Sequence, residues 1–395
     1  MVPNGWEQIR LNDVTEFITS GSRDWAQFYS DSGSKFVRMT NLSRDSIYLK
    51  LDDMKYVDVS SKSADGKRTS LSAGDVLMSI TAELGKIGWI PANFGEAYIN
   101  QHTALIRLND KRANSQYIAY LLSSKAMNHR INKLNDSGAK AGLNLPTIRS
   151  IHINLPSLPE QRKIAQILST WDRGIAITEK LIDVSKQQKK ALMQQLLTGK
   201  KRLIDPETGK AFEGEWEEVK LGDVCTPQQW ATISSKALLD EGYPVYGANG
   251  HIGFYSEFNH EYETVAVTCR GSTCGEVSLI PEKSYITGNA MCLDNISPAK
   301  HSYIFVYYAL CKRGFTDVIS GSAQPQIVGK AIKNVKFIIP ALKEQQKIAS
   351  VLTSADKDIE LLEAKLLHFK QEKKALMQQL LTGKRRVKVA ETEAA

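Results

Sequence analysis

The sequence predicts an α+β protein in which two mixed α/β modules are separated by two long helices. The helices are expected to form an antiparallel coiled-coil pair with pseudo-two-fold symmetry. Three observations lead to this prediction. The chain has 395 residues, enough for two or more domains of about 100–200 residues each. It contains a gapless internal repeat, and both copies of the repeat carry the apolar spacing of a long helix.

The repeat is clearest in two connectors. The segment that starts at Glu160 aligns without a gap with the segment that starts at Glu344, at an offset of 184 residues. Residues 189–200 are identical to residues 373–384. A match of this length indicates that the two connectors adopt the same structure.

The openings of the modules also match, residues 5–14 with residues 215–224. The repeat divides the chain into module 1 (1–158), connector 1 (159–202), module 2 (203–342), connector 2 (343–386) and a flexible tail (387–395). The modules diverge between their matching ends. This favours one scaffold that presents two recognition surfaces, while a duplication without functional division is the alternative.

The connectors are predicted to be helical because Lys, Gln, Leu, Ala and Glu dominate them. Apolar or small residues recur at spacings of four and three, from Ile164 to Leu196 and from Ile348 to Leu380. This is a heptad pattern, and Lys189 and Lys373 interrupt it at equivalent positions. About 40 residues make a helix of roughly 60 Å. We expect the two apolar stripes to bury each other.

The modules are predicted to be small sheets with a few helices. Short segments rich in Val, Ile and aromatic residues predict strands at 36–39, 75–80, 85–90, 104–108, 264–268, 276–280, 284–287 and 291–293. Helices are predicted at 115–122 and 302–310. Polar loops are expected at 20–24, 42–45, 65–69, 247–253, 270–275 and 321–326.

The net charge of +8 is unevenly distributed. The stretches 160–202 and 343–388 carry +6 and +5, whereas residues 1–159 carry +4, residues 203–342 carry −5 and residues 389–395 carry −2. A solvated outer face explains the basic connectors most simply. Phosphate binding and a docking surface for another protein are the alternatives.

The sequence lacks several catalytic motifs. It has no phosphate-binding loop of the Gly-x4-Gly-Lys-Ser/Thr type and no Pro-Pro pair, which the Asn/Asp-Pro-Pro-aromatic loop of amino-methyltransferases requires. No Cys/His cluster has zinc spacing, since Cys269 and Cys274 alone are too few. Residues 205–210 hold a nuclease-like carboxylate–lysine set, but in a polar turn. We therefore predict no catalytic residue, no cofactor site and no metal site.

The composition also indicates the cellular compartment in which the protein is expected. No apolar run reaches the roughly 18–20 residues that span a bilayer, and the first residues lack a secretion-signal pattern. The five cysteines include no Cys-x-x-Cys pair. We expect reduced thiols and a cytoplasmic protein.

Two features together resemble the specificity (S) subunit of type I restriction–modification systems, over essentially the whole chain. They are the Gly/Glu-Trp-Glu openings and the connector signature Glu-Gln-x-Lys-Ile-Ala…Lys-Lys-Ala-Leu-Met-Gln-Gln-Leu-Leu-Thr-Gly-Lys. Residues 243–250 and 321–326 also resemble segments of target-recognition domains. The resemblance implies a non-catalytic subunit whose modules each recognise one half of a bipartite, asymmetric DNA target. The helices would set the spacing between the half-sites.

The same resemblance implies partners that carry the chemistry. Two methyltransferase subunits would dock on the helices, bind S-adenosylmethionine and methylate adenine N6. Motor-nuclease subunits, with ATP and Mg²⁺, would complete the restricting complex. The alternative is a tandem interaction scaffold that dimerises through its helices and binds protein or carbohydrate. The −5 charge of module 2 favours that alternative.

Base recognition needs side chains in exposed loops. Arg suits guanine, Asn and Gln suit adenine, and Lys, Ser, Thr and Tyr contact phosphates. The candidates are Arg38, Asn41, Arg68, Lys86 and Gln101 in module 1, and Tyr246, Asn249, His251, Arg270, Asn289 and Gln324 in module 2.

Overall fold

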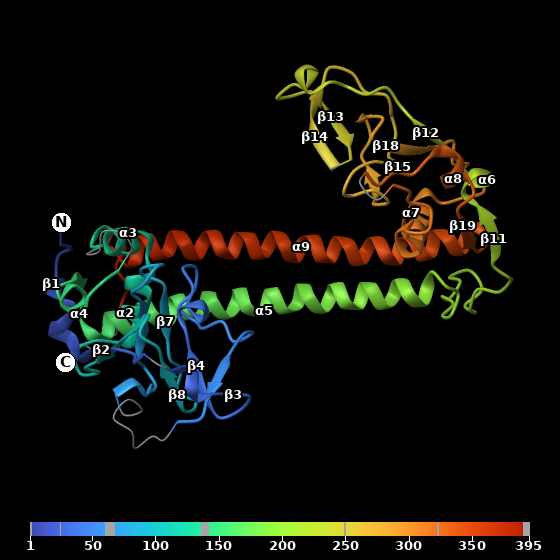
Figure 1. Cartoon of the computed structure of the whole chain (residues 1–395). Coiled ribbons are helices and arrows are strands. Elements are labelled where there is room, and N and C mark those ends of the chain that lie inside the picture. Colours follow the sequence, from blue (N-terminus) through green and yellow to red (C-terminus); the bar gives the residue numbers. More distant parts are fainter. Residues whose placement is uncertain are drawn as a thin grey trace. The chain divides into compact units, whose positions relative to one another are not determined.

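The structure is a computed structural model that describes residues 2–23, 25–59, 68–135, 142–248, 250–321 and 324–389. It divides into two compact units (Figure 1), unit 1 with Met1–Ile177 and Leu366–Ala395, and unit 2 with Thr178–Lys365. Both boundaries fall inside the long helices α5 (Leu158–Leu196) and α9 (Leu342–Leu380). Each unit therefore holds one module and the parts of both helices that pack on it.

Unit 1 contains two four-stranded sheets and a two-stranded ribbon. The first sheet is antiparallel with the order β2-β9-β6-β7, and the second has the order β3-β5-β4-β8, in which β4 and β8 are parallel. The ribbon pairs β1 with β10. The strands are β1 (Glu7–Arg10), β2 (Thr15–Ser20), β3 (Tyr29–Ser30), β4 (Ser34–Val37), β5 (Lys55–Val57), β6 (Val76–Ser79), β7 (Ile87–Trp89), β8 (Ala97–Ile99), β9 (Thr103–Leu108) and β10 (His152–Leu155).

Unit 2 has the same plan. Its four-stranded antiparallel sheet has the order β12-β18-β15-β16, its second sheet β14-β13-β17 contains the parallel pair β13–β17, and β11 pairs with β19. The strands are β11 (Glu217–Lys220), β12 (Thr226–Gln229), β13 (Tyr243–Gly247), β14 (Gly250–Tyr255), β15 (Thr264–Thr268), β16 (Val277–Ile280), β17 (Tyr285–Ile286), β18 (Ala290–Asp294) and β19 (Lys336–Ile339). The repeat thus extends to strand order within modules whose sequences diverge.

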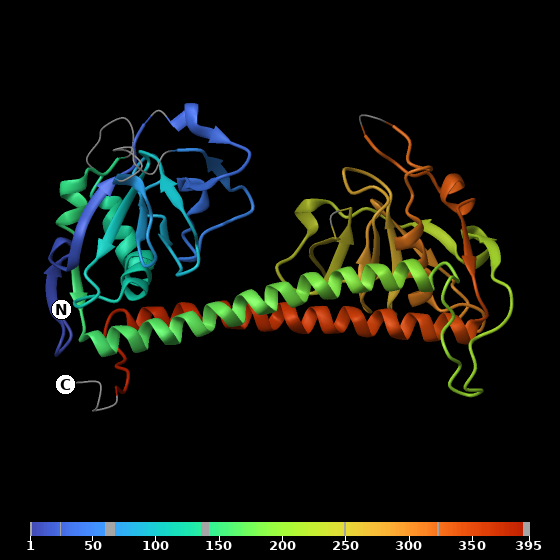
Figure 2. The ribbon, with the colours of Figure 1, turned by 90° about the horizontal axis from the view of Figure 1, so that it is seen from below.

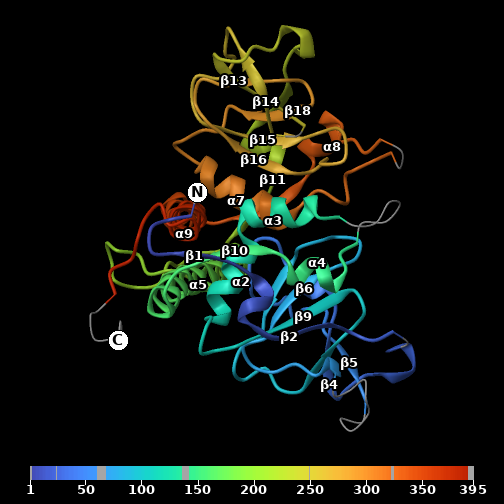
Figure 3. The same cartoon turned by 90° about the vertical axis from the view of Figure 1, so that its left-hand side faces the viewer.

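Short helices complete the two units. They are α2 (Ser115–Ser123), α3 (Lys125–Lys133) and α4 (Leu145–Arg149) in unit 1, and α6 (Leu221–Val224), α7 (Tyr303–Arg313) and α8 (Gly329–Lys333) in unit 2. The helices α2 and α7 begin at side-chain caps, because Asn114 accepts the amide of Tyr117 and Ser302 accepts the amide of Phe305. The apolar residues of α2 are buried, and Figure 3 shows α2 beside α5.

The predicted α+β class is confirmed. Each predicted strand segment overlaps an observed strand, and the predicted helices at 115–122 and 302–310 correspond to α2 and α7. One boundary differs. Residues 38–39 were predicted to end a strand, but the chain turns into the 3₁₀ helix Met39–Asn41 because the side chain of Asn41 accepts the amide of Arg38.

The long helices end earlier than the predicted connectors. Both have 39 residues, so each is about 58 Å long. They stop at Leu196 and Leu380, and Gly199 and Gly383 follow with φ of 68° and 67°. A Cβ on Gly383 would lie 2.5 Å from Cγ of Pro3, so the left-handed turn also passes too close to the N-terminal segment for a side chain.

The helices run antiparallel and side by side within each unit (Figure 2). In unit 1 the rings of Trp171 and Phe369 pack edge to face with centroids 5.5 Å apart. In unit 2, Lys186 of α5 pairs with Glu363 of α9 at 2.7 Å. The predicted antiparallel pair is therefore confirmed.

A buried ionic cluster joins helices and module in unit 1. Asp172 of α5 accepts Nζ of Lys373 from α9 and the hydroxyl of Tyr120 from α2, both at 2.5 Å. The side chains of Lys373 and Asp172 are only 9% and 10% exposed. A carboxylate at this depth needs such partners, because burial without them is very unfavourable.

Unit 2 contains the equivalent cluster. Asp356 of α9 accepts Nζ of Lys189 from α5 and, at 2.6 Å, the hydroxyl of Tyr308 from α7. The offset of 184 residues relates Asp172 to Asp356 and Lys189 to Lys373. The two lysines that interrupt the heptad pattern are thus the two cations of these clusters.

Two further contacts at the helix starts are repeated. Glu160 is held by Nε and Nη2 of Arg386, both at 2.7 Å, and Glu344 is held in the same way by Arg202 at 2.6 and 2.7 Å. Gln161 accepts the amide of Asn114 at 2.8 Å, and its counterpart Gln345 accepts the amide of Ser302 at 3.0 Å. Each module is therefore attached to the helices by the same set of contacts.

Within the part of the chain that the structure describes, no helix has both the length and the hydropathy needed to cross a membrane.

Replacing Asp172 with alanine is expected to lower the free energy of unfolding by about 3–5 kcal/mol, because it leaves the ammonium group of Lys373 buried without a counter-charge. Urea unfolding followed by circular dichroism measures this loss. The control is Lys186→Ala, which breaks an ion pair whose side chains are about half exposed, 54% and 48%. That change should cost about 0–1 kcal/mol. Equal losses in the two variants would contradict the role assigned to Asp172.

Candidate nucleic-acid interface

Three loops of unit 1 gather at one end of its sheets. We call residues 20–22, 80–86 and 100–103 the unit 1 loop cluster. Ser22 bridges to Asn100, and the amide of Ile80 donates to the carbonyl of His102 at 2.9 Å. In the β6–β7 turn, Asn128 of α3 donates to the carbonyl of Gly85 at 2.6 Å. The backbone pairing thus forms a continuous, polar edge from loops far apart in sequence.

Unit 2 has the equivalent unit 2 loop cluster, residues 246–248, 268–276, 287–289, 320–321 and 324–326. The amide of Cys269 donates to the carbonyl of Asn289 at 3.0 Å, and Arg270 bridges to Gln326. Thr273 Oγ1 donates to the carbonyl of Ala248 at 2.5 Å. The bridge Arg270–Gln326 has a counterpart in unit 1, Thr81–Gly142. Both clusters therefore occupy the same place in the common topology.

Two of the unit 1 candidates, Lys86 and Gln101, belong to this cluster, and a third, Arg68, contacts it. Arg68 is exposed, and its guanidinium donates to the carbonyl of Ser20 at 3.3 Å and to Oγ of Ser22. Gln101 lies in the β8–β9 connection, with Nε2 3.1 Å from Nε2 of His102. Lys86 lies in the β6–β7 turn and pairs with Glu83; the hydrogen bond from Lys86 lowers the pKa of Glu83.

The other two unit 1 candidates form a structural turn. Arg38 donates to Asp53 Oδ2 at 2.8 Å, and this hydrogen bond lowers the pKa of Asp53. Asn41 is only 2% exposed, and its amide oxygen and nitrogen bind the amide of Arg38 and the carbonyl of Lys50, both at 2.9 Å. Because Asn41 is buried and its amide is bonded to the backbone, we do not propose it as a DNA contact.

The unit 2 candidates are mostly gathered on the unit 2 loop cluster. Arg270 and Gln324 are exposed, whereas Tyr246 and Asn289 are partly buried within the cluster. His251 is exposed on β14, where its ring packs edge to face on Tyr246 and Phe254. The candidate Asn249 lies outside the described residues.

Sequence reasoning missed Gln326. It is exposed and faces Arg270 across the isolated bridge, so an amide and a guanidinium side chain come from neighbouring segments. The loop 321–326 was predicted as polar, but the sequence offers no basis for choosing between Gln324 and Gln326.

The acidic excess of module 2 lies elsewhere. The described residues of the unit 2 loop cluster include one basic and one acidic side chain, Arg270 and Glu276. Seven of the 16 acidic residues in 203–342 precede β12, at positions 205–223. The net charge of −5 in module 2 therefore does not come from the residues of the unit 2 loop cluster.

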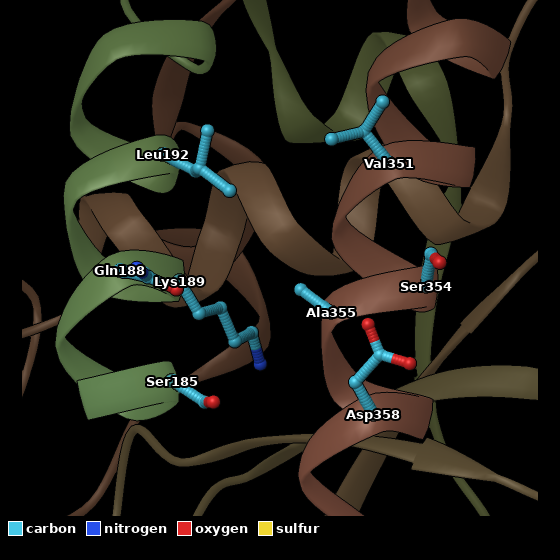
Figure 4. Close-up of a pocket in the computed structure, with 8 residues that line it drawn as sticks. All are labelled: Ser185, Gln188, Lys189, Leu192, Val351, Ser354, Ala355 and Asp358. Carbon is cyan, nitrogen blue, oxygen red and sulfur yellow. The ribbon is translucent and has the colours of Figure 1, made fainter. Parts of the chain in front are cut away.

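The contact between α5 and α9 differs between the units. In unit 2 a hollow of about 350 Å³ lies between the helices, lined by Ser185, Lys189, Ala355 and Asp358 among others (Figure 4). The residues of unit 1 that correspond to Ala355 and Ser185 are Trp171 and Phe369, which pack on each other. The helix pair is thus filled with aromatic rings in unit 1 and open in unit 2.

One face of α5 also carries exposed apolar side chains. Ile177, Leu181 and Val184 are 61%, 48% and 40% exposed, at spacings of four and three residues. Such spacing places them on one face of the helix. Exposed apolar stripes of this kind are typical of protein–protein contacts.

Comparison with known proteins gives consistent results. The family model described as type I restriction modification DNA specificity domain matches residues 3–186 and 213–369. The putative type I restriction enzyme MjaX specificity subunit of Methanocaldococcus jannaschii is 27% identical, over 98% of this chain and 95% of its own length. The MjaVIII specificity subunit of the same organism is 26% identical, over 98% and 94%.

The fold is similar to that of solved S subunits. The S subunit of a type I restriction–modification system from M. genitalium aligns with a TM-score of 0.68 at 16% identity, covering 96% of this chain and 99% of that one. A chain from a structure of the assembly of a type I restriction–modification system aligns with a TM-score of 0.56 at 18% identity, covering 98% and 100%.

Proposed function

This chain belongs to the family of type I restriction–modification DNA specificity proteins, and we propose that each unit recognises one half of a bipartite, asymmetric target. The observation that carries the proposal is the pair of loop clusters. They occupy the same end of two sheets with the same strand order, but they hold different side chains. One scaffold with two sets of side chains suits two different half-sites.

The side chains on the clusters suit direct base readout. The guanidinium groups of Arg68 and Arg270 can donate two hydrogen bonds to guanine in the major groove, and the amide of Gln326 can bind adenine. Lys86 suits a phosphate contact. The alternative scaffold that binds protein or carbohydrate is not favoured, because the DNA specificity model covers both modules.

We infer that the chain is non-catalytic and that it binds neither S-adenosylmethionine nor ATP with Mg²⁺. Support comes from the missing phosphate loop and amino-methyltransferase loop. Methylation of adenine requires a base flipped out of the duplex, and we assign that pocket to methyltransferase subunits. Motor-nuclease subunits would complete a restricting complex that acts on DNA in the cytoplasm.

We also propose that the helices have two roles, as spacer and as docking surface. The exposed face Ile177–Leu181–Val184 would contact a methyltransferase subunit, which would explain why these apolar side chains lie in solvent here. The loop clusters hold few cations, so the chain alone should bind DNA weakly and with a shallow salt dependence. Methyltransferase subunits would supply most phosphate contacts.

Each arginine should act on its own half-site. Replacing Arg270 with alanine in the assembled methyltransferase is expected to weaken binding by about 1–3 kcal/mol and to relax one half-site, because a base contact is lost. Arg68→Ala should relax only the other half-site. Methylation of a randomised target library, followed by sequencing, measures both. The control Arg313→Ala removes a cation that is paired with Asp317 and is not one of the residues that define the clusters. Relaxation of both half-sites by one variant would contradict separate recognition.

The helices should set the gap. Inserting seven helix-forming residues after Ile177 and seven after Lys365 keeps the heptad register and adds about 10 Å to the pair. At about 3.4 Å per base pair, the gap should grow by roughly three base pairs with both half-sites unchanged. The same methylation assay reports the gap. An insertion in α5 alone is the control, since it breaks the pairing and should abolish activity. An unchanged gap in the double insertion would exclude the spacer role.

The apolar face of α5 should be needed for assembly. Leu181→Glu with Val184→Glu is expected to reduce binding of the methyltransferase subunit at least tenfold, because two exposed apolar side chains become charged in the contact. Co-purification and calorimetric titration measure the effect. The matched control is Leu239→Glu, an apolar residue of unit 2 with 49% exposure, against 48% for Leu181. Equal effects of the two changes would refute this docking surface.

A further inference from the structure

Unit 2 contains a compact set of three metal-type donors away from the loop clusters. The donor atoms of His260, Cys292 and Asp294 all lie within 4.8 Å of one another. Cys292 and Asp294 alternate on β18 and therefore face the same side of the sheet. His260 comes from the segment between β14 and β15, where it bridges to Ser284.

The imidazole of His260 is held in one orientation. Asn259 donates Nδ2 to the carbonyl of Ile286 at 3.0 Å and accepts the amide of Ile286 on Oδ1 at 2.8 Å. These two bonds define which atom of the Asn259 amide is oxygen. Nδ1 of His260 lies 2.7 Å from that oxygen, so Nδ1 must carry the proton and donate it.

Nε2 of the same ring then points at a carboxylate. It lies 3.0 Å from Oδ1 of Asp294. In the neutral ring with Nδ1 protonated, Nε2 offers a lone pair, and Oδ1 of Asp294 offers another. Two lone pairs at this distance need a positive charge between them. That charge is either a proton or a metal ion.

The environment favours a metal ion. The buried thiol of Cys292 lies beside the two lone pairs and hydrogen-bonds to Asp294, so a third metal-type donor meets the same carboxylate. A thiolate, an imidazole and a carboxylate together form a donor set typical of zinc. In addition, Nδ1 donating to a carbonyl-type oxygen is the usual arrangement of a histidine that binds metal through Nε2.

We propose that Nε2 of His260, Sγ of Cys292 and Oδ1 of Asp294 bind one Zn²⁺ ion, with a solvent molecule as the fourth ligand. The ion replaces the thiol proton and the proton between His260 and Asp294, and both protons pass to solvent. Ligands at 2.0–2.3 Å in a tetrahedron stand about 3.3–3.7 Å apart. The donors, now within 4.8 Å of one another, would therefore shift by about 1–1.5 Å at most, and the His260 and Asp294 atoms, now 3.0 Å apart, would separate slightly.

Neighbouring groups hold the carboxylate in place. Oδ2 of Asp294 accepts the indole N–H of Trp230 at 3.1 Å, which leaves Oδ1 for the ion. The ring of Trp230 packs edge to face on His260 with centroids 5.2 Å apart. Side chains of His260 and Asp294 are 9% and 15% exposed, so the ion would be shielded but reachable.

The proposed ion has a structural role. It ties β18 of the four-stranded sheet to the segment that holds β17 through the two Asn259–Ile286 bonds. Residues 287–289, which follow β17, belong to the unit 2 loop cluster. The ion therefore stiffens the base of that cluster, whatever ligand the cluster binds. The sequence did not predict this site, because His260 stands 32 residues before Cys292 and lacks any zinc-type spacing.

Metal titration of the full-length chain tests the proposal. After treatment with a chelator, the chain is expected to bind one Zn²⁺ by elemental analysis, with a rise in melting temperature. Bound Co²⁺ should show a thiolate charge-transfer band in the near ultraviolet. Cys292→Ser should abolish that band, and Asn259→Ala should weaken metal binding by about 10–100-fold. The controls Cys274→Ser and Cys311→Ser should leave both properties unchanged.

Two results would contradict the proposed zinc site. If the wild-type chain binds no stoichiometric metal, the positive charge between His260 and Asp294 is a proton and the proposal is wrong. If the charge-transfer band survives Cys292→Ser but disappears in Cys274→Ser, the metal lies at another cysteine. Both results are independent of DNA recognition, since neither measurement involves DNA.

Discussion

The interaction on which each unit depends is an aspartate shared between three helices, which is buried in unit 1 and 31% exposed in unit 2. Asp172 takes a lysine from the opposite long helix and a tyrosine from its own module, and Asp356 repeats this arrangement in unit 2. One carboxylate thus sets the register of the helix pair and attaches the module to it. Sliding either helix by one turn would leave a charge buried without a partner, which is far more costly than losing an apolar contact.

This constraint explains what the two copies share and what they vary. The residues that attach a module, among them Gln161 and Gln345, recur at the same offset with the same bonds. The residues of the loop clusters take no part in these attachment contacts, so their side chains can change without disturbing the helices. A protein that recognises two different half-sites with one scaffold needs this separation.

The units are alike in topology but not in their interiors. Trp171 and Phe369 fill the helix pair of unit 1, whereas unit 2 has a hollow at the corresponding place. Unit 2 also contains the His260, Cys292 and Asp294 cluster. Because core packing depends on the whole set of neighbours, two modules can keep one strand order while their stability arises from different contacts.

The sequence alone determined the repeat, the paired helices and the positions of eight of the 19 strands in the described residues, because periodic apolar spacing and helix caps are local signals. It also placed Lys189 and Lys373 at equivalent points of the helix contact. Only the tertiary structure showed that these two lysines bind Asp172 and Asp356, and that each aspartate also binds a tyrosine of its module. It also showed that Asn41 is buried in a turn and that Gln326 lies opposite Arg270. These contacts depend on which segments, distant in sequence, lie side by side in the fold. Burial and pairing between such segments produce no periodic pattern in the sequence.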